Sequence, residues 1–359
     1  MITTAPLPPL SAVLGWGRPR CRPPEPWLRP GDRGWLLSRT CWSLAIVAEL
    51  VAARLGRPAR VALPAWFCGQ SLAPLRHGGA HLQFLPVDEA GDADWTAARD
   101  ADVAVAVHAF GRRNRLAGAR AAAPLVVEDC AHVLMPVPGI GESGDVVLYS
   151  PHKLLGLPEG AVLVLRPTGH DLAAGVTARL ADAPSSPSPA RWRIKRSIQA
   201  LLPDRARRAL PPVGQPDMAT DPAEGEVAAF GAPSSLALAL LGVADLEREA
   251  ACRRANSLAL RRAIEGLSGL APLFAEDGPA PYRFALRAAT AEAAAATYDR
   301  LRRARLPVES WPDLPPEVMA APDRFGAALA LRRTVLLLPV HGALHPSYAT
   351  RYAEALHGS

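Results

Sequence analysis

The sequence predicts an α/β fold, with a mostly parallel sheet between helices in a large domain and a smaller α+β domain after it. Short apolar runs recur through the first half of the chain, and several of them lack polar alternation. Runs of this kind, separated by helical or turn material, are typical of a doubly wound sheet covered on both faces. Between residues 181 and 226 the chain becomes proline-rich and basic. We therefore expect a large domain over residues 1–225 and a small domain over residues 226–359.

The elements of the large domain follow from local patterns. Residues 1–34 are proline-rich and are expected to be irregular. A helix is expected over residues 41–55, with Ser38 or Thr40 as its N-cap. Its apolar residues recur at helical spacing: Leu44, Val47, Ala48 and Val51. Strands are expected at residues 60–63, 81–87, 101–107, 124–127, 145–149 and 160–165.

The small domain is expected to begin with one long helix over residues 228–267, which includes a charged stretch that starts at Asp245. A strand at residues 282–286 and a helix over residues 291–305 follow. A second strand is expected at residues 334–339, and a terminal helix over residues 346–356. Helices and few strands in this order indicate an α+β arrangement.

Composition and charge narrow the class of protein. Hydrophobic residues make up 49% of the 359 residues and charged residues 21%, which is ordinary for a soluble globular protein. The net charge of +6 favours an acidic or phosphorylated ligand more than nucleic acid. No apolar run reaches the ~18 residues of a membrane span, and the N-terminus lacks a signal-peptide pattern. The cysteines are dispersed and without metal-ligand spacing, which indicates a reducing compartment and a cytoplasmic location.

An acid and a lysine follow two of the predicted strands. Asp129 comes after the run at residues 124–127, and Lys153 comes just past the run at residues 145–149. A buried carboxylate and a lysine at neighbouring strand ends are what a pyridoxal 5'-phosphate (PLP) site needs. The acid keeps the pyridine nitrogen protonated, and the lysine forms the Schiff base. The alternatives are a solvated loop lysine and an aspartate that caps the next helix.

Several motifs occur in an order that resembles the DegT/DnrJ/EryC1/StrS family of fold-type-I PLP enzymes, best known as sugar aminotransferases. They lie at residues 38–40, 61–64, 79–80, 87–88, 107–111, 128–132 and 338–341. The resemblance covers most of the chain. It implies a fold-type-I PLP transferase with Lys153 as the Schiff-base lysine and proton carrier, and Asp129 as the partner of the pyridine nitrogen. His132 takes the family position that contacts the phenolic oxygen of the cofactor, with a plain packed histidine as the alternative.

The cofactor phosphate needs amides and hydroxyls. Backbone N–H groups of Arg39 and Thr40, at the start of the predicted helix 41–55, can bind an anion there. Ser150 can add a hydroxyl. An ordinary capping role for Thr40 or for Ser38 is compatible with this one.

An aromatic side chain is expected to stack on the cofactor ring. Trp66 and Phe67 are the candidates, although a gapless count from Pro64 places Cys68 at the position that is aromatic in the family. Core packing of Trp66 is the alternative. Glu128 is expected to point away from the site, because side chains alternate along a strand.

Three features differ from the family pattern or leave alternatives open. The segment Ser150–Lys153 is two residues shorter than its family counterpart, and Arg39 replaces a glycine. The basic segment 191–208 could reach across a dimer interface, bind an acidic surface, or serve as a solvated connector. His108, His132 and His152 lie at no recognised metal-ligand spacing, so no metal is expected.

The resemblance implies an aminotransferase with a small-molecule amino donor, by family habit glutamate, and a keto or aldehyde acceptor. The acceptor could be a keto sugar or another natural-product intermediate. A homodimer with shared active sites is expected. The alternatives are other PLP carbanion chemistry, such as a dehydratase or decarboxylase, and a non-catalytic scaffold.

Overall fold

The computed structural model describes residues 6–8, 10–15, 17–114, 116–186, 189–201, 218, 229–311 and 313–357 of the 359-residue chain. Its larger sheet has seven strands in the order β1-β7-β6-β5-β4-β2-β3. Their bounds are β1 (Arg33–Leu37), β2 (Arg60–Pro64), β3 (His81–Leu85), β4 (Val103–Val107), β5 (Leu125–Cys130), β6 (Val146–Tyr149) and β7 (Ala161–Leu165). Strands β2 to β6 pair in parallel, whereas β7 is antiparallel to both of its neighbours. The predicted mostly parallel sheet is confirmed.

Strand β1 is not among the predicted elements: residues 1–34, which include its first two residues, were expected to be irregular, and no element was expected at residues 35–37. Its register on β7 runs from Arg33 opposite Leu165 to Leu37 opposite Ala161. The stretch contains arginine and glycine and has no strong strand pattern of its own. It becomes a strand because it covers the edge of β7, which is a long-range interaction.

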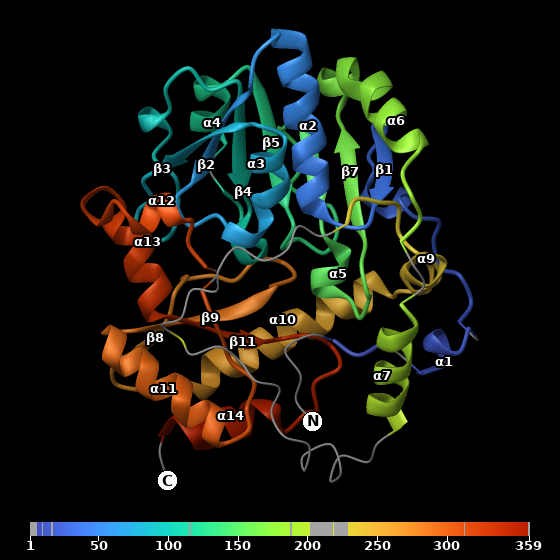
Figure 1. Ribbon diagram of the computed structural model, residues 1–359. Coiled ribbons are helices and arrows are strands. Elements are labelled where there is room, and N and C mark those ends of the chain that lie inside the picture. Colours follow the sequence, from blue (N-terminus) through green and yellow to red (C-terminus); the bar gives the residue numbers. More distant parts are fainter. Residues whose placement is uncertain are drawn as a thin grey trace.

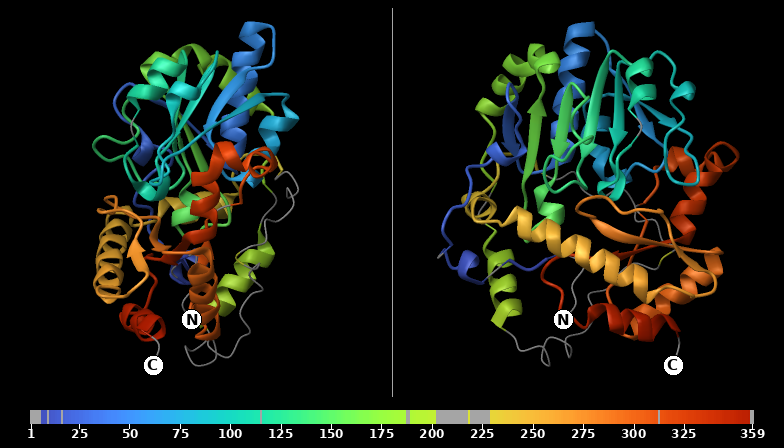
Figure 2. Two further views of the ribbon diagram at one scale, coloured as in Figure 1. Left: turned by 90° about the vertical axis from the view of Figure 1, so that its left-hand side faces the viewer. Right: turned by 180° about the vertical axis from the view of Figure 1, so that it is seen from behind.

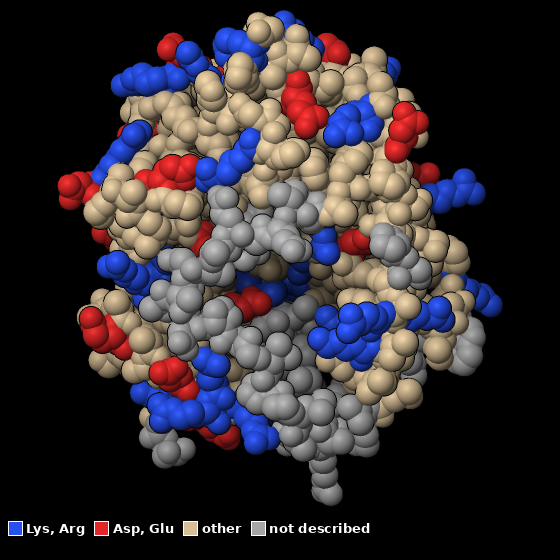
Figure 3. Space-filling model, viewed as in Figure 1, with Lys and Arg blue, Asp and Glu red and all other residues tan. Residues whose placement is uncertain are grey.

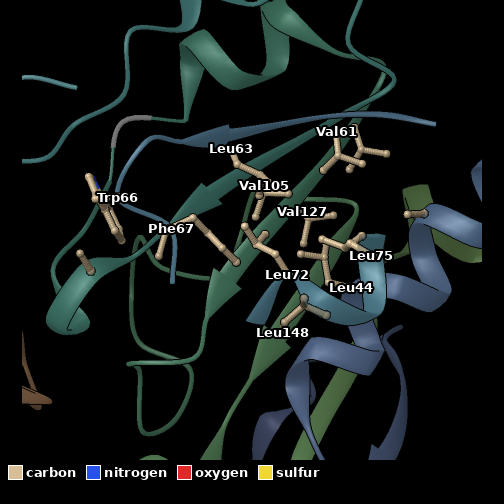
Figure 4. Packing of buried hydrophobic residues seen from close by; sticks show 14 of the residues in the cluster. Leu44, Val61, Leu63, Trp66, Phe67, Leu72, Leu75, Val105, Val127 and Leu148 are labelled. Atoms are coloured by element: carbon tan, nitrogen blue, oxygen red, sulfur yellow. The ribbon is translucent and has the colours of Figure 1, made fainter. Parts of the chain in front are cut away.

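Alternate residues of the strands face two layers of helices (Figure 1, Figure 2). One face packs against α2 (Thr40–Leu55) and α3 (Ala73–His77), and it carries branched side chains: Val61, Leu63, Val103, Val105 and Val127. In Figure 4, Val61, Val105 and Val127 of the strands lie in one cluster with Leu44 of α2 and Leu75 of α3. On the other face, β2 and β4 carry alanines, including Ala62, Ala104 and Ala106, and this part packs against α4 (Ala117–Ala122). Both faces are therefore buried, as the unbroken apolar runs indicated.

A second, antiparallel sheet of four strands lies below the first in Figure 1, in the order β10-β11-β9-β8. Its strands are β8 (Leu270–Pro272), β9 (Arg283–Ala288), β10 (Glu309–Ser310) and β11 (Val335–Pro339). The helices around it are α10 (Leu246–Ala263), α11 (Ala291–Arg303), α12 (Pro316–Met319), α13 (Pro322–Thr334) and α14 (Tyr348–His357). The predicted α+β character is confirmed, and two of its strands and two of its helices are those expected.

The predicted single helix over residues 228–267 is wrong. The chain forms α9 (Ser235–Gly242) and α10, and it breaks between them. The Asp245 carboxylate accepts the Arg248 N–H at 3.1 Å and caps α10. An aspartate with this bond favours a helix start over a continuous helix. Residue 228 lies outside the described residues.

Residues 17–32, in dark blue, run along one side of the molecule, past α9, to the larger sheet (Figure 1). The N–H groups of Arg20 and Cys21 donate to the Gly242 carbonyl at 2.7 and 3.2 Å, at the end of α9. The buried Trp27 donates its indole N–H to the Leu134 carbonyl at 3.0 Å. The segment thus connects α9 to the loop after β5 and then forms the edge strand β1.

The remaining helices are short or peripheral. They are α1 (Leu10–Val13), α5 (Pro151–Leu154), α6 (Ala173–Ala181), α7 (Ala190–Leu201) and the 3-10 turns Glu25–Trp27, Gly69–Ser71, Trp95–Ala97, Ala109–Gly111 and Pro167–Leu172. Helix α7 occupies part of the basic segment 191–208, of which residues 202–208 lie outside the described residues. The predicted domain boundary after residue 225 lies outside them too and stays a prediction. Within the described part of the chain, no helix combines the length and apolar character that crossing a bilayer requires.

Candidate active site

Asp129 and Lys153 lie at the same edge of the larger sheet. Asp129 is in β5 and pairs in register with Leu148 of β6, and the one-turn helix α5 that carries Lys153 begins two residues after β6 ends. Because β5 and β6 are parallel, their carboxyl ends meet at one edge, where α/β proteins bind ligands. The structure thus brings together the two residues that the sequence singled out.

The pKa of Asp129 also shows the influence of Lys153. Burial raises the pKa of Asp129, and the positive charge of Lys153 and a 2.8 Å bond from the Ala131 N–H offset only part of that rise. Among the described residues, none makes a hydrogen bond or ion pair with the half-buried Lys153 ammonium. A buried acid with a raised pKa and an unpaired amine therefore lie within electrostatic range of each other, and both have unused bonding capacity.

His132 is held between two aromatic rings from different parts of the fold. Its ring stacks on Tyr282 at 4.2 Å between centroids and 8° between planes, and on Phe110 at 5.5 Å and 27°. The Phe110 N–H donates to Nδ1 of His132 at 3.2 Å, so the ring proton lies on Nε2. Burial, followed by the charges of Lys153 and Arg283, lowers the pKa of His132 well below its ordinary value. The histidine is packed and neutral, and it keeps one N–H that can donate.

Glu128 points to the other side of β5, as predicted. Its carboxylate accepts His108 Nε2 at 2.8 Å and the amides of Gly141, Ser143 and Gly144 at 2.7, 2.6 and 2.5 Å. His108 accepts the Asn114 N–H on Nδ1 at 3.0 Å, so its Nε2 carries the proton that it donates to Glu128. Burial alone would raise the pKa of Glu128, but these bonds outweigh it and the pKa is lowered. Glu128 therefore serves the fold and does not face the site.

His108, Glu128 and Cys130 have potential metal-ligand atoms within 4.8 Å of one another. Both ring nitrogens of His108 and both oxygens of Glu128 already take part in the bonds above. Burial and the two neighbouring acids raise the pKa of Cys130 well above its ordinary value, so the thiol stays protonated. These three residues therefore form a hydrogen-bonded part of the core, and their bonds leave little capacity to bind a metal ion.

The amino end of α2 lies beside Lys153. Thr40 Oγ1 donates to the Tyr149 carbonyl at 3.4 Å, directly before Ser150. After burial, the dominant cause, the charge of Arg39 lowers the pKa of His152, and the charges of both Arg39 and Lys153 oppose the raised pKa of Cys41. Arg39 and Lys153 therefore both lie close enough to Cys41 and His152 for their charges to influence the pKa values of those two residues.

The predicted N-cap of α2 is wrong. Arg39 occupies the N-cap position and makes no side-chain capping bond, whereas the Ser38 hydroxyl donates to the Ala229 carbonyl at 3.4 Å. The first-turn amides of this 16-residue helix consequently have no side-chain cap. Uncapped amides at a helix start, next to a cation, favour an anion.

Ser150 is fully buried before α5, and its Oγ lies 3.1 Å from Nδ1 of His152. That same Nδ1 lies 2.9 Å from the Gly160 carbonyl, to which only a protonated nitrogen can donate. Burial first, and then Arg39, lowers the pKa of His152 to about 3, so the ring is neutral. His152 was not among the predicted site residues, although its place beside Lys153 was visible in the sequence.

Trp66 and Phe67 lie in the hydrophobic core, each 5% exposed. The Trp66 indole N–H donates to the Gly91 carbonyl at 2.7 Å, and its ring packs edge-on against Trp311 at 5.5 Å. Figure 4 shows Phe67 beside Leu72 and Trp66 at one end of the same cluster. Their packing favours the core alternative, and stacking on a cofactor stays a prediction.

Two residues of the second half of the chain complete the region and were not predicted. Tyr282 stacks on His132, and the buried Arg253 of α10 donates to the Leu154 carbonyl at 2.6 Å, next to Lys153. No local pattern in the sequence marks either one, because both contacts join the two halves of the chain. Figure 3 shows a hollow near the middle of one face, with basic and acidic side chains in it.

A cavity of about 680 Å³ lies to one side of this region. It is lined by residues 6–8, 11, 12 and 17–20, by Leu155, Gly156 and Leu157, and by residues at and between α9 and α10 and in the chain after β11. None of the predicted site residues lines it.

No protein-family model and no curated protein sequence matches the chain. Solved structures do match it. The sugar aminotransferase CalS13 from Micromonospora echinospora aligns with a TM-score of 0.66 and 20% identity over 99% of both chains. Helicobacter pylori PseC, an aminotransferase involved in pseudoaminic acid biosynthesis, aligns with a TM-score of 0.63 and 12% identity over 90% of this chain and 86% of its own. The chain has the fold of these enzymes.

A third match of this fold is the E. coli GDP-4-keto-6-deoxy-D-mannose-3-dehydratase with bound hydrated PLP. Its TM-score is 0.61 at 14% identity, over 90% of this chain and 87% of that one. The alignments span nearly the full length of each relative, so both sheets of this chain belong to one shared architecture. The predicted fold-type-I architecture is confirmed.

Proposed function

We propose that this chain is a PLP-dependent aminotransferase of the DegT/DnrJ/EryC1/StrS type. The observation that carries the proposal is that Asp129 and Lys153 lie within electrostatic range of each other at the carboxyl ends of β5 and β6. A buried carboxylate with a raised pKa needs a cation, and the half-buried amine has no partner among the described residues. The solved relatives of this fold include PLP enzymes, which supports the same cofactor here.

The residues fit PLP at each of its polar groups. Asp129 would hold the pyridinium nitrogen, since a cation there relieves the cost of burying its charge. His132 would donate its Nε2–H to the phenolic oxygen. Ser150, Thr40, Arg39 and the uncapped amides of α2 would bind the phosphate. When bound, PLP supplies an electron sink that stabilises negative charge on the reacting carbon.

The protein's own part in the reaction is proton transfer and orientation. Lys153 would carry the proton at the reacting carbon as a general base and then a general acid. The neutral His132, fixed by Phe110 and Tyr282, would orient the ring without adding a second positive charge. We propose an amino-acid donor, glutamate first, and a keto or aldehyde acceptor such as a keto sugar or a natural-product intermediate.

We also propose a cytoplasmic homodimer with shared active sites. The exposed apolar residues of α7 support an interface, because Ile194, Ile198 and Leu201 are 59%, 53% and 67% exposed. The division into domains at residues 225 and 226 remains part of the proposal.

The decisive experiment uses the low lysine content of the chain, which has only Lys153 and Lys195. Purified protein with PLP is expected to show a band near ~420 nm that gives way to one near ~330 nm when L-glutamate is added. Lys153→Ala should lack the first band, and Lys195→Arg is the matched control that should keep it. A band that ignores amino acids would favour other PLP chemistry or a scaffold. Absence of any band in the wild type would contradict the proposal.

A further inference from the structure

Arg253 is a fully buried cation in the joint between the two sheets. It lies on α10 and is 0% exposed. One terminal nitrogen, Nη2, donates to the Leu154 carbonyl at 2.6 Å. The other, Nη1, donates to the carbonyls of Pro281 and Tyr282 at 3.0 and 3.1 Å. Its Nε lies 2.8 Å from Oε1 of Glu249, one turn earlier on the helix, in an ion pair that is not aligned as a hydrogen bond.

A charge in such a place is costly unless its bonds are complete. Burial lowers the pKa of Arg253 to about 10, which still leaves the side chain charged at neutral pH. An apolar residue would suit a helix face that also buries Ala250 and Leu260. The guanidinium is instead matched to a carboxylate and three carbonyls, and a planar fork meets such acceptors better than any other side chain.

The carbonyls that Arg253 binds belong to the two sides of the candidate site. Leu154 follows Lys153 directly and ends the one-turn helix α5, where a carbonyl has no partner within the helix. Tyr282 carries the ring that stacks on His132. One side chain therefore holds the backbone behind the lysine and the backbone behind the histidine's stacking partner.

We propose that Arg253 is a positioning residue that fixes Lys153 relative to His132 through the carbonyls of Leu154 and Tyr282. Its role in catalysis rests on the function proposed above. Displacement of a reacting group by about 1 Å can cost ~100-fold in rate. Helix α5 has a single turn, and its other anchors are the bonds of His152 to the Gly160 carbonyl and the fully buried Leu154 side chain.

The test compares Arg253→Met and Arg253→Lys with Arg254→Met. Arg254 is the adjacent residue on α10 and binds the Pro279 carbonyl at 2.8 Å from an exposed position, so it is a matched control. With PLP bound, Arg253→Met is expected to lower kcat about 10- to 100-fold with KM for the donor nearly unchanged. The pH midpoint at which the visible band titrates should also shift. Arg253→Lys should recover part of both, and Arg254→Met should match the wild type.

A second readout needs no cofactor. Reductive methylation of the PLP-free protein reports Lys153 against Lys195, which is exposed on α7 and serves as an internal standard. Arg253→Met, or Arg253→Lys if the former does not fold, should change the Lys153:Lys195 rate ratio several-fold, and Arg254→Met should leave it unchanged. A wild type that binds no PLP would defeat the proposed function while this ratio still tested Arg253. An unchanged ratio, or an unchanged kcat and band titration in a folded variant, would overturn the positioning role.

Discussion

Two neighbouring acids on β5 have opposite surroundings. Glu128 is surrounded by four donors and has a lowered pKa, whereas Asp129 accepts one backbone N–H and has a raised pKa. Side-chain alternation along a strand, which is visible in the sequence, separates the two faces. Only the structure shows that the donors for Glu128 come from His108 and the loop at residues 141–144. The acid with few partners is the one available to a ligand.

Replacing Glu128 by Gln should destabilise the protein. The new NH2 group would face backbone N–H groups and His108, so we expect a loss of about 3 kcal/mol in the free energy of unfolding at neutral pH. Because the folded pKa of Glu128 lies below its ordinary 4.5, the carboxylate stabilises the fold above that pH, and this contribution disappears as pH falls through the folded pKa. Urea unfolding of both proteins should therefore show converging stabilities below pH 4.5. A gap that stays constant down to pH 3 would contradict this account.

The substitution His132→Phe should distinguish a packing role of His132 from a role in binding the cofactor. A phenyl ring can remain between Phe110 and Tyr282, but it cannot accept the Phe110 N–H, so thermal unfolding should show a loss of about 1 kcal/mol. The visible band of bound PLP should shift, because the proposed donor to the phenolic oxygen is gone. An unshifted band would assign His132 to packing alone. Tyr282→Phe, which keeps the stack, is the control that should leave the band in place.

At the scale of elements, the N-cap position of α2 holds a residue that does not stabilise the start of the helix. Arg39 occupies the N-cap position and does not cap. Arg39→Ser should therefore raise the stability of the PLP-free protein by about 1 kcal/mol. The same change should weaken PLP binding, because it removes a cation and occupies an amide that the phosphate would use.

These two effects have opposite signs, so they can be measured independently by thermal unfolding and by PLP titration. Thr290→Ala is the control for capping, since Thr290 accepts the Ala293 N–H at 3.2 Å at the start of α11. It should lose about 1 kcal/mol and leave PLP affinity unchanged. Tighter PLP binding in Arg39→Ser would contradict the phosphate assignment.

The sequence predicts those elements that carry their own pattern. The apolar runs of the central strands and the spacing of α2 and α11 are local signals, and all of these elements are present. Strand β1 and the break before Asp245 depend on β7 and on a single capping bond. In the same way, the ends of β5 and β6 mark Asp129 and Lys153 in the sequence. Arg253 and Tyr282 come close to the site only because the two sheets pack together. No local sequence pattern predicts that packing.

At the scale of the whole molecule, α7 has an apolar stripe flanked by cations. Ile194, Ile198 and Leu201 are exposed, and Figure 3 shows Lys and Arg side chains gathered over this helix. We expect light scattering to give about twice the 38.0 kDa chain mass. Ile194→Glu with Ile198→Glu should shift the protein toward the monomer, because charges would enter a buried interface.

Leu258→Glu is the matched control for this prediction, since Leu258 is an exposed apolar residue of α10 at 47% exposure. It should leave the mass unchanged. A monomeric wild type, or an α7 variant that remains dimeric, would remove α7 from the proposed interface.

The path of the first residues has a consequence for synthesis. Residues 33–37 complete the larger sheet by pairing with β7, and Arg20 and Cys21 bind the Gly242 carbonyl more than 200 positions later. A ribosome releases a chain from its amino end, so these residues emerge before their partners do. Until residue 165 has emerged, the outer edge of β7 does not exist, and α9 comes later still. During that interval residues 20, 21 and 33–37 lack the partners that they have in the folded structure.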